Sequence, residues 1–308
     1  MRPMPLPVVH HPAYVAPMPQ GHRFPMGKFG RVMELLLEDE VVTPEQVRVP
    51  ELAPRAWLEL AHEPAYVEGV LGQSLDAASV RRIGLPITAE VARRSRAATG
   101  GTMLTARLAL EFGIACNTAG GSHHAFAGYG SGFCVFNDVG VAVRVLLAEG
   151  TIGRAFVVDL DVHQGDGTAA MFEGDPRVFT FSMHCRNNFP LRKQTSDLDL
   201  ALDAGVEDAA YLRLLAEHLG GLLEEVRPDL VFFNAGVDPH ASDRLGRLAL
   251  TEEGLIGRER LVFESCLRGG IPVAGVLGGG YAPDLEQLAR LHSIQHRIAS
   301  EFFGPLRL

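Results

Sequence analysis

Apolar residues in the second two-thirds of the chain follow two alternating patterns. Short continuous apolar runs, typical of buried strands, occupy 114–118, 155–161, 178–183, 230–235 and 271–277. Between them, apolar residues recur every three or four positions, which predicts helices over 101–112, 138–147, 211–226, 255–267 and 285–298. Strands that alternate with helices indicate a parallel sheet covered on both faces. We therefore predict an α/β fold with a central, mostly parallel sheet flanked by helices.

The first hundred residues are less regular. They predict a short strand over 6–9, a Pro/Gly-rich loop over 16–27 and a helix over 29–37. Residues 43–100 mix helical patches with Pro and Gly and show no domain boundary. The chain contains no internal repeat and no low-complexity segment, so we expect a single domain over residues 1–308.

Composition and charge narrow the class of protein. The 308 residues are 47% hydrophobic and 21% charged, which supports a full core and argues against disorder. The net charge of -9 and the absence of a Lys/Arg run argue against a nucleic-acid partner.

Cysteine usage and hydropathy predict a cytoplasmic protein. The 4 cysteines are scattered without CxxC spacing, which suits a reducing compartment. The N-terminal residues lack the apolar core of a signal peptide, and no apolar run approaches membrane-spanning length. We therefore expect neither secretion nor a membrane partner.

Three polar side chains stand at the end of a hydrophobic strand. Residues 155–168 read AFVVDLDVHQGDGT and place Asp159, Asp161 and His163 at alternate positions, hence on one face of a strand. Burying these groups unpaired is costly, and a bound cation would offset that cost. Asp161 and His163 could supply two ligands for zinc or a similar divalent ion. The alternative is a cluster paired to Arg or Lys.

Chemically active residues follow the other strands as well. Five consecutive strand ends carry Gly together with polar residues: His123 and His124, then Asp166, His184, Asp238 and finally Tyr281. Taken singly, adjacent histidines are often surface residues, Asp before Pro opens turns, and the glycines 278–280 suit a tight turn. Ligands of open α/β sheets bind beyond the carboxyl ends of strands, so the convergence predicts a site there.

Five ordered motifs resemble the zinc-dependent histone deacetylase superfamily, which has the arginase–deacetylase fold. They are GGSHHA, GFCVFND, DLDVHQGDGT, NAGVDPHASDRLG and LGGGY, and the resemblance runs from about residue 10 to about residue 287. The details VHQGDG, RNNFP and AGVDPH resemble the class IV deacetylases and their bacterial relatives in particular. Gln164 stands where the class I enzymes carry a second His, which favours the same subgroup.

The resemblance implies a set of site residues and two kinds of ion. It makes Asp161, His163 and Asp238 the ligands of Zn²⁺, with Fe²⁺ as another candidate. The implied catalytic residues are His123 and His124 with their carboxylate partners Asp159 and Asp166, and Tyr281. The implied substrate tunnel consists of Phe133, Phe189, Gly132 and Gly279. The implied structural potassium (K⁺) site consists of Asp159, Asp161, His163, Ser182 and Met183.

Two further matches are partial. Phe172 and Val178 match part of a second potassium site, but Asp175 replaces the usual residue there. Arg23 is a looser match to an arginine that lines the channel behind the zinc.

The implied activity is removal of acetyl or longer acyl groups from lysine side chains of a protein or peptide by metal-activated water. An acetylpolyamine or another acylated small amine is the alternative substrate, but such enzymes usually carry a long N-terminal insertion that residues 12–28 lack. Arginase-like enzymes bind two metals through D-x-H-x-D, whereas the order here is D-x-D-x-H-x-x-D. A non-catalytic acyl-lysine binder would be expected to have lost Tyr281 or a metal ligand. Acyl-chain length, native metal and oligomeric state are open at this point.

Overall fold

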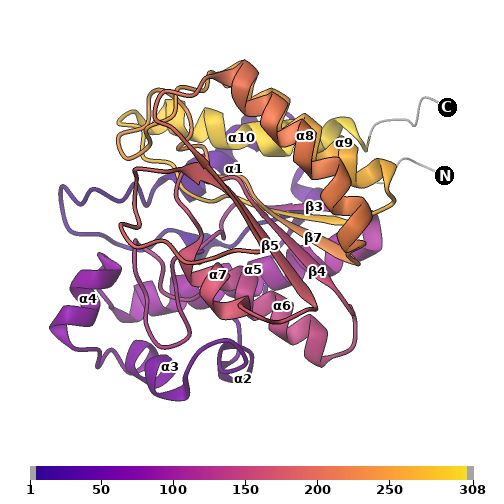
Figure 1. The fold of residues 1–308 in the computed structure, drawn as a ribbon. Coiled ribbons are helices and arrows are strands. Elements are labelled where there is room, and N and C mark those ends of the chain that lie inside the picture. Colours follow the sequence, from indigo (N-terminus) through magenta and orange to yellow (C-terminus); the bar gives the residue numbers. More distant parts are fainter. Residues whose placement is uncertain (1–4, 304–308) are drawn as a thin grey trace.

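One sheet of parallel strands forms the centre of the computed structural model, which describes residues 5–303 (Figure 1). The strands are β1 (Val8–Val9), β2 (Val47–Arg48), β3 (Ile114–Asn117), β4 (Ala155–Asp159), β5 (Val178–Cys185), β6 (Leu198–Leu202), β7 (Leu230–Asn234) and β8 (Val273–Val276). Their order across the sheet is β2-β1-β3-β8-β7-β4-β5-β6. Every pairing between these strands is parallel, which confirms the predicted α/β fold.

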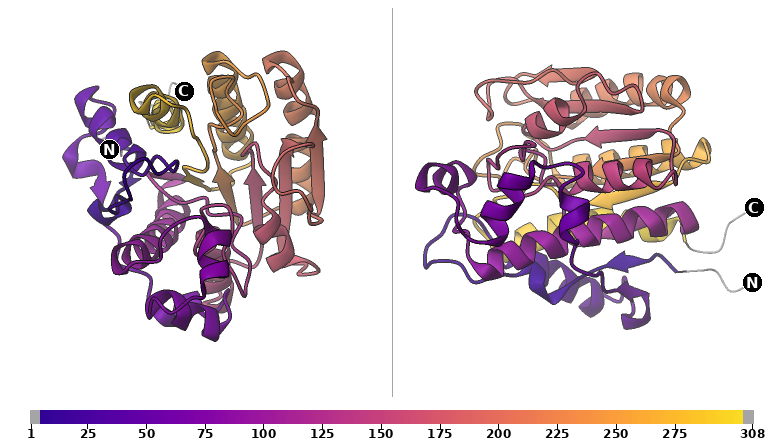
Figure 2. Two further views of the ribbon diagram at one scale, coloured as in Figure 1. Left: turned by 90° about the vertical axis from the view of Figure 1, so that its left-hand side faces the viewer. Right: turned by 90° about the horizontal axis from the view of Figure 1, so that it is seen from below.

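Helices cover both faces of the sheet, as Figures 1 and 2 show from three sides. One face carries α1 (Lys28–Glu38), α8 (Asp208–Val226), α9 (Glu252–Arg268) and α10 (Leu285–Glu301). The other carries α5 (Ala89–Phe112), α6 (Asp138–Ala148) and α7 (Asp166–Phe172). The short helices α2 (Arg55–Leu58), α3 (Pro64–Leu71) and α4 (Ala77–Ile83) lie outside this layer, and two 3₁₀ turns span Pro12–Tyr14 and Pro44–Gln46. Within residues 5–303 no helix combines the length and the apolar character needed to cross a bilayer.

The central strand β4 sets the position of the site. All five of its residues are buried because β5 and β7 flank it and helices cover both its faces. Its last residue, Asp159, pairs in register with Ser182 of β5 and Asn234 of β7. The chain therefore leaves β4 and β7 at the same level, and the loops that follow them meet above the sheet.

Several boundaries differ from the sequence predictions. The strand predicted over 155–161 ends at Asp159, so Asp161 and His163 lie in the turn beyond it. The helix predicted from residue 101 begins at Ala89, where the side chain of Thr88 caps it by accepting a hydrogen bond from Val91 N at 3.2 Å. Gly101 lies inside that helix. The residue there must be small because a Cβ would collide with the hydroxyl of Tyr14. Neither the edge strand β6 nor the short helix α7 was predicted.

Candidate active site

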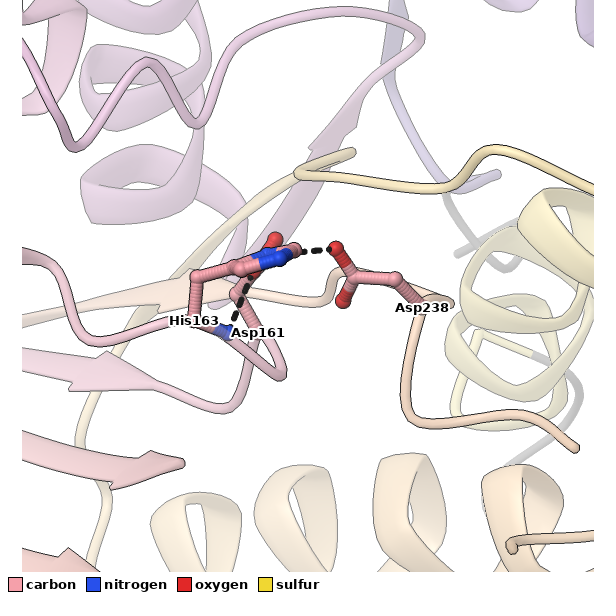
Figure 3. A group of neighbouring side chains, drawn as sticks. All are labelled: Asp161, His163 and Asp238. Carbon is pink, nitrogen blue, oxygen red and sulfur yellow. Dashed lines mark hydrogen bonds and ion pairs between the residues drawn. The ribbon is translucent and has the colours of Figure 1, made fainter. Parts of the chain in front are cut away.

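Three buried side chains from two loops form a candidate metal site. Asp161 and His163 follow β4, whereas Asp238 follows β7 and points toward them from the other side (Figure 3). His163 Nδ1 lies 3.0 Å from Asp161 Oδ1 and 3.1 Å from Asp238 Oδ2. One ligand atom from each residue lies within 4.8 Å of the other two. An imidazole and two carboxylates at this spacing suit a divalent cation with an open coordination position.

The charges of this cluster fit a bound cation. Burial and, second to it, the neighbouring Asp161 carboxylate raise the pKa of Asp238 to about 7. Among the described residues no Arg or Lys forms an ion pair with either carboxylate, which argues against the alternative of a cluster paired to basic side chains. The backbone fixes the remaining oxygens, since Gly279 N donates to Asp161 Oδ2 at 2.7 Å and Val162 N donates to Asp238 Oδ1 at 2.9 Å. A Cβ at Gly279 would collide with both carboxylates, so only glycine fits there.

The adjacent histidines differ in charge. His123 Nδ1 lies 2.7 Å from Asp159 Oδ2 and His124 Nδ1 lies 2.6 Å from Asp166 Oδ1. Burial would lower the pKa of His123, but the carboxylates of Asp159 and Asp161 outweigh it and raise the pKa to about 9. Burial and the adjacent His123 cation lower the pKa of His124 to about 4 despite Asp166. Near pH 7, His123 is therefore cationic and His124 neutral.

A helix N-terminus holds the histidine loop in place. The loop leaves β3 through Gly120 and Gly121, whose φ values of 88° and 84° favour glycine. Asp138, the first residue of α6, accepts hydrogen bonds from Gly121 N at 3.0 Å and Ser122 N at 2.7 Å. The short α7, which sequence analysis missed, contributes Thr168, whose backbone N–H donates to the carbonyl of His123 at 3.0 Å.

Tyr281 stands beside the candidate metal site at the end of the glycine turn. Its backbone N–H donates to Asp243 Oδ2 at 2.6 Å, and its ring centroid lies 6.4 Å from that of His163. Burial raises the pKa of Tyr281 well above its usual value, and the carboxylates of Asp238 and Asp161 add to the effect. The hydroxyl therefore stays protonated and able to donate a hydrogen bond.

An outer pocket of about 300 Å³ leads from the surface to these groups. Phe133, Phe189 and Gly132 line it together with His163 and Tyr281. A Cβ at Gly132 would lie 2.7 Å from the His124 ring and 3.0 Å from Phe189, so glycine keeps this wall open. Gly279, predicted with the tunnel, instead lines a separate inner cavity behind the metal site.

Arginines occupy the rim of the outer pocket. Arg23, Arg244 and Arg247 all line it, and no Asp or Glu does. Arg23 lies 4.9 Å from the ring centroid of Phe133, on the outer side, so its suggested place in the channel behind the metal is wrong. The wall of the inner cavity contains Arg94 instead.

The residues predicted around potassium lie within β5, at the end of β4 and in the turn after β4. Ser182 and Met183 lie in β5, and Ser182 is in register with Asp159 of β4, just before Asp161 and His163. The partial second site is different. Asp175 forms ion pairs with Arg144 at 2.6 Å and Arg177 at 2.8 Å, which hold its pKa well below the usual range. Two cations already compensate this carboxylate, so the geometry gives no support for potassium there.

Sequence analysis missed several residues that support the site. Asn234 Nδ2 donates to Asp159 Oδ1 at 3.0 Å. The buried Arg258 donates to the carbonyls of Leu160 at 3.0 Å and Gly236 at 2.7 Å, which fixes the turns after β4 and β7. A signal for Arg258 existed, because it lies between Leu255 and Val262 on the apolar stripe of a predicted helix. Lys28, which donates to the carbonyls of Gly278 at 3.2 Å and Gly280 at 3.3 Å, had no such signal.

Comparison with known proteins gives matches along nearly the whole chain. Residues 22–296 match the histone deacetylase domain family. An uncharacterized protein of Picosynechococcus sp. is 58% identical over 97% of this chain and 100% of its own length. Histone deacetylase 2 of Arabidopsis thaliana is 30% identical over 90% of this chain and 76% of its own length. A crystal structure of an HDAC homolog complexed with SAHA superposes with a TM-score of 0.82 at 24% identity, covering 97% of this chain and 84% of that one, which shows a shared fold.

Proposed function

The chain belongs to the histone deacetylase family, and from this premise we propose that it is a metal-dependent amidohydrolase that removes acyl groups from lysine side chains. One observation carries the proposal: the buried cluster of Asp161, His163 and Asp238 lies against the histidine pair, and His163 and His124 both line the outer pocket. The proposal includes membership of the class IV branch, a cytoplasmic location and a structural K⁺ between β5 and the end of β4. All 4 cysteines are free, in keeping with a reducing compartment.

Asp161, His163 and Asp238 would hold the ion, with Zn²⁺ as the proposed metal and Fe²⁺ as the other candidate. When bound, such an ion lowers the pKa of a water molecule from about 15.7 toward neutrality and polarises a carbonyl.

The protein's own groups manage the protons. His124, neutral near pH 7, is available to accept a proton from the attacking water and then pass it to the departing lysine amine. Asp166 accepts from its Nδ1–H, which leaves Nε2 as the basic nitrogen. The cationic His123 would stabilise developing negative charge, and the protonated Tyr281 hydroxyl would donate to the carbonyl oxygen as that oxygen becomes anionic.

The lining of the outer pocket supports the proposal of lysine over polyamines. Its aromatic walls would bury lysine methylenes at about 0.8 kcal/mol each. The three rim arginines repel a polyamine, which carries further positive charges, but they tolerate a peptide with neutral or acidic flanking residues. An acetylpolyamine is therefore the second candidate substrate.

Assaying the metal-reconstituted protein on acyl-lysine peptides and acetylpolyamines tests the proposal. We expect hydrolysis of the peptides with a higher kcat/KM than for any polyamine. Metal analysis should find one ion per chain, lost in the Asp161→Ala/Asp238→Ala double variant. Full metal occupancy in that variant, or a preference for acetylpolyamines, would contradict the assignment.

A further inference from the structure

A second cavity lies on the inner side of the candidate metal site. It offers about 30 Å³, and since one water needs roughly 10–15 Å³ by this measure, it has room for two or three waters. It shares His124, Gly132, Phe133 and Tyr281 with the outer pocket, so the two spaces meet at the reacting groups. The end of an acyl chain bound at the metal site would therefore reach the inner cavity.

A buried guanidinium without a partner lines this cavity. Arg94, on α5, is only 4% exposed, yet its Nε has no hydrogen-bond acceptor. No ion pair among residues 5–303 involves Arg94 either, whereas the other fully buried arginine, Arg258, pairs with Glu259 at 2.7 Å. A buried cation without a hydrogen-bonded counter-charge is costly, so a ligand anion is the natural complement.

Aromatic rings that line the cavity pack against the guanidinium of Arg94 and leave its hydrogen-bond donors free. Its guanidinium lies 4.6 Å from the ring centroid of Phe29 and 5.9 Å from that of Phe24. An aromatic ring does not accept the strong hydrogen bonds of a guanidinium, so these contacts leave the N–H donors for a carboxylate. The carboxylate of Asp138 is nearby but already accepts from Thr102, Gly121 and Ser122.

We propose that Arg94 makes the inner cavity a carboxylate-binding site, and that the enzyme hydrolyses lysine acyl groups that end in a carboxylate, with malonyl as the size match. This rests on the proposed function. Water adds across the amide: its oxygen bonds to the carbonyl carbon, the C–N bond breaks, and the nitrogen leaves as the protonated lysine amine. The products are lysine and malonate, and no oxidant or reductant is needed.

Matched peptides separate charge from size. Malonyl-lysine and isovaleryl-lysine have nearly the same shape, but only the first carries an anionic end, and acetyl-lysine reports basal activity. We expect wild-type kcat/KM to be at least tenfold higher for malonyl than for isovaleryl. Arg94→Met should lower malonyl turnover at least tenfold while changing acetyl turnover less than threefold, and Arg94→Lys should restore part of the loss. Arg93→Gln, on the exposed side of the same helix, is the matched control and should change neither.

Calorimetry with malonate and with acetate provides a readout independent of catalysis. We expect malonate to bind the wild-type protein and to lose at least tenfold in affinity in Arg94→Met. Equal effects of Arg94→Met on malonyl and acetyl peptides, a wild-type preference for isovaleryl, or binding of acetate alone would overturn the inference. A protein that hydrolyses no acyl-lysine but still binds malonate through Arg94 would instead contradict the proposed function. The carboxylate site would remain supported in that case.

Discussion

At the scale of single residues, the two histidines share a backbone segment but have opposite charge states. Because His124 is the neutral base, His124→Ala should lower kcat by roughly 10² to 10⁴. His123→Gln should lower kcat by less than this, when each variant is measured at its own optimal pH. Steady-state kinetics of both variants on one acyl-lysine peptide, with metal content checked, measures the difference, and equal losses would contradict the division of roles.

The pH profile gives a second test of the same pair. The neutral form of His124 is active, so with the metal bound its protonation should lower wild-type kcat/KM as the pH drops toward about 4. The cationic form of His123 is active, so kcat/KM should fall again as the pH rises through about 9. His123→Gln removes the adjacent cation that helps to depress the pKa of His124, and its acid limb should move upward. An unchanged acid limb would mean that the two rings are not coupled.

Tyr281 is predicted to act through its hydroxyl alone. Tyr281→Phe should keep the metal and the KM but lower kcat by about 10² to 10³, because the hydroxyl is needed once charge develops on the carbonyl oxygen. The ring contact with Phe133, at 5.7 Å between centroids, survives the change and preserves the pocket wall. A normal kcat with an altered KM would make Tyr281 a wall residue only.

The sequence identified residues whose polarity conflicts with their place after a buried strand. His123, Asp161 and Asp238 all follow apolar runs, and that conflict is visible without coordinates. Arg94 and Lys28 carry no such mark, since charged residues are common in helices. Only burial makes them unusual, and their burial depends on the packing of α5 and α1 against the loops of the site.

At the scale of elements, α9 supports the site because its Arg258 holds the turns after β4 and β7. Arg258→Met should lower the free energy of unfolding by about 3–5 kcal/mol, because Glu259 would be left as an unpaired buried charge and the carbonyls of Leu160 and Gly236 would lose their donor. Arg260→Gln is the control, since Arg260 pairs with Glu301 at the surface and should cost about 1 kcal/mol or less. Urea unfolding of both variants measures the contrast, and equal small losses would show that Arg258 does not brace the turns.

Element boundaries were predicted well where the apolar pattern was strong and poorly where tertiary contact decides. The helix predicted over 211–226 is observed as Asp208–Val226. The helix predicted from residue 101 begins at Ala89, because Gly101 serves close packing against Tyr14 and does not mark a start. Strand β4 ends two residues earlier than predicted, and Asp161 and His163 lie in the turn that follows, where they meet Asp238.

At the scale of the whole molecule, sheet order explains how distant segments meet. Strands β3 and β4 are consecutive among the central strands of the chain, yet β8 and β7 lie between them in the sheet. The loops after β3, β4, β7 and β8 therefore converge at one edge of the sheet. They supply the histidine pair, the candidate metal ligands and Tyr281. Alternating helices and strands predict the parallel sheet, but no local pattern encodes this order, which depends on contacts between remote strands.

The stability that the folded molecule gains from its metal should depend on pH. Without metal, burial and Asp161 raise the pKa of Asp238 to about 7, above its unfolded value near 3.9, so the stability this group contributes is lost as the pH rises through 7. The pKa of His163 is also raised, to about 10, because its two carboxylate partners outweigh burial, and its contribution declines between about pH 6.5 and 10. Metal binding has the opposite dependence, since the ligands must be deprotonated.

The difference in Tm between metal-loaded and chelator-treated protein should therefore widen from pH 5.5 to 8.5. Thermal unfolding across this range tests the coupling, with the Asp161→Asn/Asp238→Asn variant as a control that should ignore the chelator. A constant or narrowing difference would mean that the three side chains do not hold the ion.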